Sequence, residues 1–227
     1  MEKEKKSTLI VDSCPLICEK YKEILTPVDK ESEIYLFNID VAYNYEGAFE
    51  VVKKIIETES YLDFIILELK LPHTEDKRIL SGLDFGILVR KLLPTTKIIV
   101  STSCNDNYMV HSIFKNLNPE GFLIKKDLTS DNFQEAIASI VNETPYYSRT
   151  VLKLLRKKIS NEYLLDSMDR KILYELSIGS RMKDLPNYIP LSVASIEKRK
   201  RQLRKVFGVK NKGDRELILK AREIGVI

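Results

Sequence analysis

The sequence predicts an α/β domain with a parallel sheet, followed by a smaller domain made of helices alone. Over residues 1–142, short and almost continuous apolar runs alternate with segments of helical periodicity, whereas from residue 161 onward the periodicity is helical throughout. Apolar runs without polar alternation are typical of strands in a parallel sheet that helices cover on both faces. The 227 residues suffice for two such domains, each with its own core.

Five apolar runs are the predicted strands of the first domain, and they span residues 7–12, 33–43, 63–69, 97–101 and 121–125. Helical spacing follows the first, second and fifth runs, over residues 15–25, 46–57 and 131–141, and a further helix begins at Ser81. In a sheet of this type the working site lies beyond the carboxyl ends of the strands. The residues that we expect there are Asp12, Ser13, Glu68, Thr102 and Lys125.

In the second domain, residues 161–227, helical periodicity predicts four helices in a helix-turn-helix arrangement. They span residues 167–177, 182–188, 193–207 and 213–224, with Ser167 and Ser192 as N-caps and Gly179 and Gly208 just past two of the helix ends. Pro186 should shorten or bend the second helix. Between the domains, residues 143–160 are expected to form a linker with a short basic helix.

Charge is divided unevenly between the two parts of the chain. Residues 150–227 hold 19 Lys and Arg against 9 Asp and Glu, a net charge of +10, and the first 149 residues hold 18 against 24, a net charge of −6. This asymmetry indicates a polyanionic partner for the C-terminal part. The alternative is a pair of unevenly charged solvated surfaces.

Other features limit the classes of function. Three cysteines without a CxxC pair fit free thiols in a reducing cytoplasm, and no apolar run reaches the roughly 20 residues that span a bilayer. The only two histidines, His73 and His111, are too far apart in sequence to suggest a metal site. We therefore expect a cytoplasmic protein with no membrane association, metal ion or other cofactor.

The segments LIVDS, IILELKLP, IIVSTS and GFLIK, in this order, resemble a response-regulator receiver domain, which has a flavodoxin-like (βα)5 fold. In that family two acidic residues after the first strand and an acceptor aspartate on the third hold Mg²⁺, while a Thr or Ser and a Lys bind the phosphoryl oxygens. Asp12, Thr102 and Lys125 match this pattern. Ser13 stands in place of the second acidic residue, and Glu68 in place of the acceptor. Phe122 matches the aromatic residue that rotates between states, although a buried aromatic is more often simple core.

The two departures predict that phosphotransfer is lost and that the Mg²⁺ site is degenerate. The extra methylene of Glu68 moves its carboxylate by about 1.5 Å, which spoils in-line attack and crowds the metal. A carboxylate beside Lys125 also imitates part of the charge of a phosphate, roughly −1.5 to −2. Glu68 therefore either locks the domain in an active-like state or fills a vestigial site, and the sequence leaves both open.

Residues 182–212 and the landmarks around them resemble the LuxR/NarL type of helix-turn-helix. On residues 193–207, periodicity places Ile196 and Leu203 inward and a basic surface outward. The resemblance implies that Glu197, Lys198 and Arg201 contact bases, with Lys205 on the same outward face. The candidates for phosphate contacts are Arg199, Lys200, Arg204, Lys210 and Lys212. A solvated basic helix without a DNA partner is the alternative.

Together the two resemblances predict an atypical, aspartate-less response regulator of the NarL/FixJ type. Its expected function is that of a sequence-specific transcription regulator, not an enzyme, which binds double-stranded DNA as a homodimer and acts without aspartyl phosphorylation. RNA polymerase is a further candidate partner, and a cognate histidine kinase is not favoured. Two alternatives remain: a conventional two-component phospho-switch with a kinase partner, and a receiver fold retained as a docking module for a protein or ligand.

Overall fold

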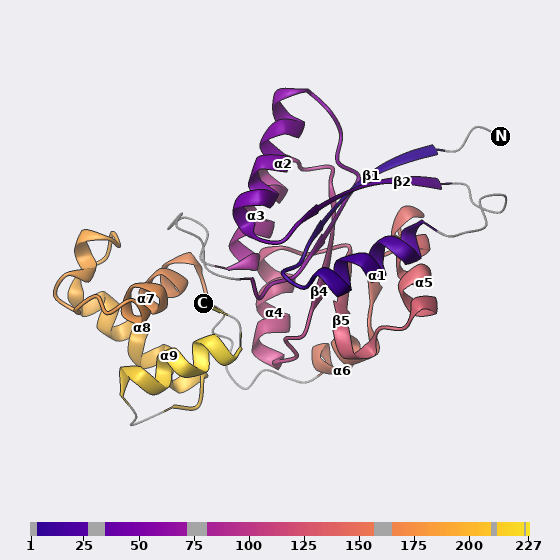
Figure 1. Ribbon diagram of the computed structural model, residues 1–227. Helices are drawn as coiled ribbons and strands as arrows, with labels where there is room; N and C mark the ends of the chain where they lie inside the picture. The colour runs from indigo at the N-terminus through magenta and orange to yellow at the C-terminus, as the bar shows by residue number, and fades with distance from the viewer. Residues whose placement is uncertain (1–3, 27–34, 72–80, 157–164, 210–212, 225) are drawn as a thin grey trace.

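The computed structural model describes residues 4–26, 35–71, 81–156, 165–209, 213–224 and 226–227, which form an α/β domain and a helical domain (Figure 1). The α/β domain contains a parallel sheet of six strands in the order β2-β1-β3-β4-β5-β6. The strands are β1 (Glu4–Val11), β2 (Tyr35–Ala42), β3 (Phe64–Leu67), β4 (Lys97–Thr102), β5 (Gly121–Ile124) and β6 (Tyr146–Tyr147). The predicted α/β class is therefore confirmed.

Helices cover both faces of the sheet because successive strand residues point to opposite sides. On β1, Leu9 and Val11 belong to a core shared with α2 (Tyr45–Glu57), α3 (Gly82–Leu92) and α4 (Asn107–Asn116). Ile10 lies between them and packs on the other face, against α1 (Pro15–Leu25) and α5 (Ser130–Val141). The near-continuous apolar strands of the sequence follow from this burial on both faces.

Two elements of the first domain were not predicted. The helix α4 follows β4 directly, and the short strand β6 pairs in parallel with β5. The segment expected to be a linker thus begins by extending the sheet. It continues as α6 (Arg149–Leu155), whose Val151 and Leu154 are buried in the core that α4 helps to form.

The helical domain consists of α7 (Ser167–Ser177), a 3₁₀ turn η2 (Leu185–Asn187), α8 (Val193–Val206) and α9 (Asp214–Glu223). The second predicted helix is reduced to η2, in agreement with the effect expected of Pro186. The predicted cap of the first helix was wrong by one residue, because Asp166 caps α7 in a capping box with Asp169. None of the helices in the described ranges has the length and apolar character needed to cross a membrane.

Candidate functional sites

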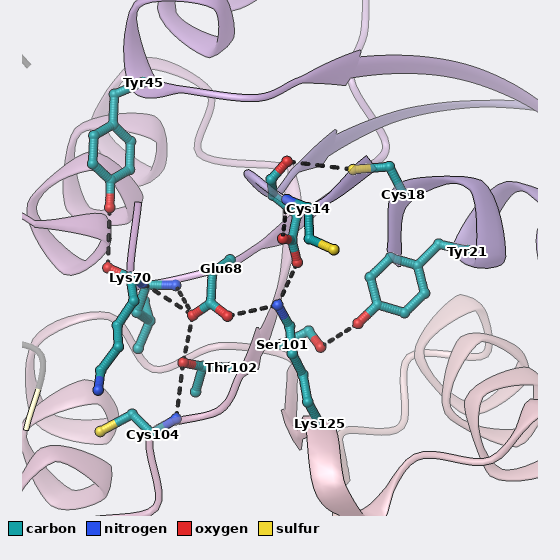
Figure 2. Close-up of polar contacts among 12 residues, drawn as sticks. Cys14, Cys18, Tyr21, Tyr45, Glu68, Lys70, Ser101, Thr102, Cys104 and Lys125 are labelled. Atoms are coloured by element: carbon teal, nitrogen blue, oxygen red, sulfur yellow. Dashed lines mark hydrogen bonds and ion pairs between the residues drawn. The ribbon is translucent and has the colours of Figure 1, made fainter. Parts of the chain in front are cut away.

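Glu68 lies directly after β3, at the carboxyl edge of the sheet, and only 5% of it is exposed (Figure 2). Its Oε1 accepts hydrogen bonds from the backbone N–H groups of Leu69 and Lys70, at 2.7 and 3.0 Å. The same oxygen accepts a 2.5 Å hydrogen bond from the hydroxyl of Thr102, at the end of β4. The carboxylate is thus held by three donors before any cation is considered.

Lys125, which follows β5, supplies the cation of the site. Its Nζ lies 2.7 Å from Glu68 Oε2 and 2.5 Å from Asp12 Oδ2 (Figure 2). The other oxygen of Asp12 accepts the backbone N–H of Cys14 at 3.0 Å. Burial disfavours the charged form of Lys125, but the hydrogen bonds to Asp12 and Glu68 outweigh burial and raise its pKa above the usual 10.5.

The residues present do not fit a Mg²⁺ ion of the kind that receiver domains hold. Such an ion requires several oxygen ligands in near-octahedral geometry. Both carboxylates of the site are bridged by the Lys125 ammonium group, and Ser13, exposed beside Asp12, adds no charge. Among the described residues there is no group of three or more His, Cys, Asp or Glu side chains suited to a metal.

The structure brings together Asp12, Glu68, Thr102 and Lys125, which the sequence placed at the ends of four strands. Phe122 is fully buried on β5, and its ring centroid lies 5.7 Å from that of Phe114. Phe114 in turn meets Tyr147 edge to face at 5.0 Å. Phe122 is therefore part of an aromatic cluster that joins β5, α4 and β6.

Four residues around the site were not among the predicted site residues. The hydroxyl groups of Tyr21 and Ser101 lie 2.6 Å apart beside Lys125, and burial raises the pKa of Tyr21 to about 12 (Figure 2). Lys70 and Cys104 each stand two residues past a predicted site residue, and both side chains contact the helical domain. Their position two residues past Glu68 and Thr102 was the feature of the sequence that could have identified them.

On α8, the four residues expected to face outward, Glu197, Lys198, Arg201 and Lys205, are all exposed. Ser192 caps the helix through the Ser195 N–H, and Ile196 and Leu203 are fully buried on the opposite side. The outward side of α8 is therefore an accessible surface with three cations and one carboxylate. This surface, defined by those four residues, is called the α8 face below.

The candidates for phosphate contacts divide into two groups. Arg199 forms ion pairs with Asp166 and Asp169 at 2.8 and 2.9 Å. Lys200, which is 7% exposed, and Arg204 share Asp214 at 3.1 and 2.5 Å. These three cations brace α8 against the start of α7 and α9, and Lys210 and Lys212 lie outside the described residues.

No protein-family model and no curated protein matches this sequence. Among solved structures, the chain is similar to the RcsB response regulator of Salmonella typhimurium, with a TM-score of 0.63, 18% identity and coverage of 97% of this chain and 98% of that chain. RcsB of Salmonella enterica serovar Typhimurium bound to the rprA promoter with the phosphomimetic BeF₃⁻ has a TM-score of 0.64 and 19% identity, over 96% of this chain and 98% of that chain. The isolated REC domain of that RcsB has a TM-score of 0.55 and 17% identity, over 66% of this chain and 99% of that chain. The chain thus shares the two-domain fold of these proteins.

Proposed function

We propose that this chain is a DNA-binding transcription regulator of the response-regulator type that acts without aspartyl phosphorylation and binds double-stranded DNA as a homodimer. The observation that carries the proposal is the closed network around Glu68, on a chain that also presents the exposed α8 face. The shared fold supports this assignment, because solved RcsB structures include complexes with DNA and dimers bound to DNA.

Three features of the site argue against transfer of a phosphoryl group to Glu68. Both of its oxygens are engaged, and the side chain is almost entirely buried. In-line attack requires an accessible oxygen opposite the leaving group. The lysine that would bind a phosphoryl oxygen is held by Asp12 and Glu68 instead.

The same contacts favour a locked state over a vestigial site. In the receiver family, the Thr or Ser and the Lys bind the phosphoryl group, and here the corresponding residues Thr102 and Lys125 both bind the Glu68 carboxylate. We infer that Glu68 takes the place of the phosphoryl group and permanently holds the Thr102 hydroxyl on its carboxylate.

The α8 face is the proposed reading surface. Arg and Lys side chains suit guanine O6 and N7, and a carboxylate accepts from the amino group of cytosine. Arg201, Lys198 and Glu197 are therefore assigned to bases, with Lys205 beside them. Because Arg199, Lys200 and Arg204 are held in ion pairs, we assign them primarily to positioning α8.

A phosphodonor experiment tests the proposal. The full chain is incubated with Mg²⁺ and acetyl phosphate, and its intact mass, its dimer fraction and its affinity for a DNA fragment selected from a random pool are measured. We expect no phosphate adduct and no change in dimerisation or DNA binding. A stoichiometric adduct that tightens DNA binding would show a kinase-partnered phospho-switch instead, and failure to enrich any DNA sequence would favour a docking module.

A further inference from the structure

The helical domain lies beside α3 and α4 of the α/β domain (Figure 1), and among the described residues three polar contacts join the two domains. Arg170 of α7 donates a hydrogen bond from Nε to Asp84 Oδ1 on α3 at 2.8 Å, and its terminal nitrogen forms an ion pair with the same oxygen at 2.7 Å. Lys70 Nζ donates to the carbonyl oxygen of Glu223 at 2.8 Å. Cys104 Sγ donates to the carbonyl oxygen of Ile224 at 2.9 Å.

Two of these contacts end on the last carbonyl groups of α9. Such groups have no partner within their own helix and carry its partial negative charge. An ammonium group is therefore a favourable partner for the Glu223 carbonyl. Burial raises the pKa of the Cys104 thiol, so the thiol keeps the proton that it donates to Ile224.

Both contacts to α9 start from residues that Glu68 holds in place. The backbone N–H of Lys70 donates to Glu68 Oε1 at 3.0 Å. The backbone N–H of Cys104 donates at 3.2 Å to the Thr102 hydroxyl, which itself donates to that same oxygen. Figure 2 shows the side chains of Lys70 and Cys104 extending to one side of the site, away from Lys125. One carboxylate oxygen thus fixes the two backbone positions, Lys70 and Cys104, whose side chains contact the end of α9.

The contact between Asp84 and Arg170 also depends on the backbone next to Glu68. Ser81 caps α3, and its hydroxyl also donates to the second oxygen of Asp84 at 3.0 Å. At the next position, Gly82, an added Cβ would lie 2.5 Å from Leu69 Cα and 2.9 Å from the Glu68 carbonyl oxygen. The start of α3 is therefore seated directly on the backbone that carries Glu68, and a shift of that backbone moves Asp84.

We propose that Asp84–Arg170, Lys70–Glu223 and Cys104–Ile224 form an interdomain latch whose closure is set by the Glu68 carboxylate. The α8 face stays exposed in this arrangement, so the latch fixes the orientation of the reading helix without covering it. The inference rests on the proposed function in treating Glu68 as the element that determines the state of the receiver. Latch closure is nevertheless measured without DNA or phosphodonor, so failure of the latch and failure of the proposed function can be told apart.

The three cysteines of the chain provide the measurement. The native full-length protein is alkylated with N-ethylmaleimide, and the rate at each cysteine is followed by peptide-resolved mass spectrometry. Cys104 is buried at the latch, Cys18 is buried in the α/β core and reports on unfolding, and Cys14 is partly exposed. We expect the wild-type Cys104 to react at least roughly tenfold more slowly than Cys14, and a rate equal to that of Cys14 would overturn the latch.

Two variants open the latch directly. Arg170→Met and Lys70→Met each remove a hydrogen bond from a charged donor and should speed alkylation of Cys104 roughly 10- to 100-fold, with Cys18 unchanged. The matched control is Lys126→Met, because Lys126 is also an exposed lysine and lies in the 3₁₀ turn (Lys125–Asp127) after β5. Faster alkylation of Cys18 in Arg170→Met would mean that this variant partly unfolds. Lys70→Met then provides the test, since Lys70 is exposed and lies outside the core. No acceleration at Cys104 in Lys70→Met would contradict the latch.

Glu68→Gln tests the dependence on the carboxylate. The amide of Gln offers one acceptor oxygen in place of two, so it cannot accept from Lys125 and from the Lys70 N–H and the Thr102 hydroxyl at the same time. We expect the oxygen to stay with the charged Lys125 donor and to release Lys70 and Thr102. Alkylation of Cys104 should then increase by a similar factor, while Tyr21→Phe, which removes only the contact with Ser101, should leave it unchanged. A Cys104 rate equal to wild type in Glu68→Gln would show that the domains dock independently of Glu68.

Discussion

The Thr102 hydroxyl donates to Glu68 Oε1 over 2.5 Å, and both residues are almost completely removed from solvent. The hydroxyl oxygen also accepts the backbone N–H of Cys104, so both functions of the group are used. A buried hydroxyl with two satisfied partners contributes to stability, since losing it leaves the partners unpaired. This hydrogen bond couples the end of β4 to the end of β3.

Replacement of Thr102 by Val, which keeps the shape and removes the hydroxyl, should lower the free energy of unfolding by about 1–3 kcal/mol. The loss arises because the Cys104 N–H then has no acceptor and Glu68 loses one of its three donors to Oε1. Urea denaturation followed by circular dichroism measures the change.

Thr8 offers a matched control for that substitution. It is 1% exposed on β1, and its hydroxyl has no hydrogen-bond partner among the described residues. Thr8→Val should therefore change the free energy of unfolding by less than about 0.5 kcal/mol or increase it. Equal losses in the two variants would attribute the Thr102 effect to the valine side chain and not to the hydrogen bond.

The double variant Ser13→Asp, Glu68→Asp should acquire Mg²⁺-dependent phosphorylation. Shortening the side chain withdraws the carboxylate by about 1.5 Å from Lys125, and the new aspartate adds a second acidic group beside Asp12 for the metal. Intact mass after incubation with acetyl phosphate shows whether an adduct forms. EDTA present before the phosphodonor is added should prevent the adduct from forming, and an adduct formed in the presence of EDTA would contradict this account.

The composition of the Glu68 site was predictable from the sequence because it follows from topology. Parallel strands end at one edge of a sheet, so the residues at or just after the ends of β1, β3, β4 and β5 had to meet there. Local capping was less predictable. Asp166 and Ser167 are both good N-cap residues, and the choice between them depends on the reciprocal bond that Asp169 makes to Asp166.

The contacts between distant elements could not be predicted in this way. Periodicity identifies the side of α8 on which Arg199 lies, but its partners are on α7 and just before it, about thirty residues earlier. The contacts of Lys70 and Cys104 with α9 depend on how one folded domain sits on the other. No local pattern in either segment encodes that placement.

Two arginines on α8, two residues apart, should give opposite results when replaced by alanine. Arg201→Ala should cost about 1–3 kcal/mol of discrimination between the selected DNA site and a variant site, with the free energy of unfolding changed by less than about 0.5 kcal/mol. Arg199→Ala should instead lower the free energy of unfolding by about 2 kcal/mol, because Asp166 and Asp169 each lose a charged donor. Binding titrations on both sites and urea denaturation separate the two effects. Similar profiles for both variants would show that the ion pairs do not distinguish them.

Asp127 ties the segment after Lys125 to the start of α6. It accepts hydrogen bonds from the Thr150 N–H at 2.8 Å, the Thr150 hydroxyl at 2.8 Å and the Ser148 hydroxyl at 2.9 Å. Burial acts to raise the pKa of Asp127, but these hydrogen bonds outweigh burial and lower the pKa below the usual 3.8. The ionised carboxylate is therefore the form that stabilises the fold.

Asp127→Asn should lower the free energy of unfolding by about 1–2 kcal/mol at neutral pH, since an amide accepts these bonds less well. Because the pKa is lowered on folding, the advantage of the wild type is present above the unfolded value of 3.8 and is lost as the pH falls through the folded value. Urea denaturation of both proteins from pH 8 to pH 3 should thus show a constant difference down to about pH 5 and a shrinking one below. Asp131→Asn, at an exposed position in the first turn of α5, is the control and should change stability by only a few tenths of a kcal/mol. A difference at Asp127 that persists undiminished at pH 3 would mean that the carboxylate charge does not hold α6 in place.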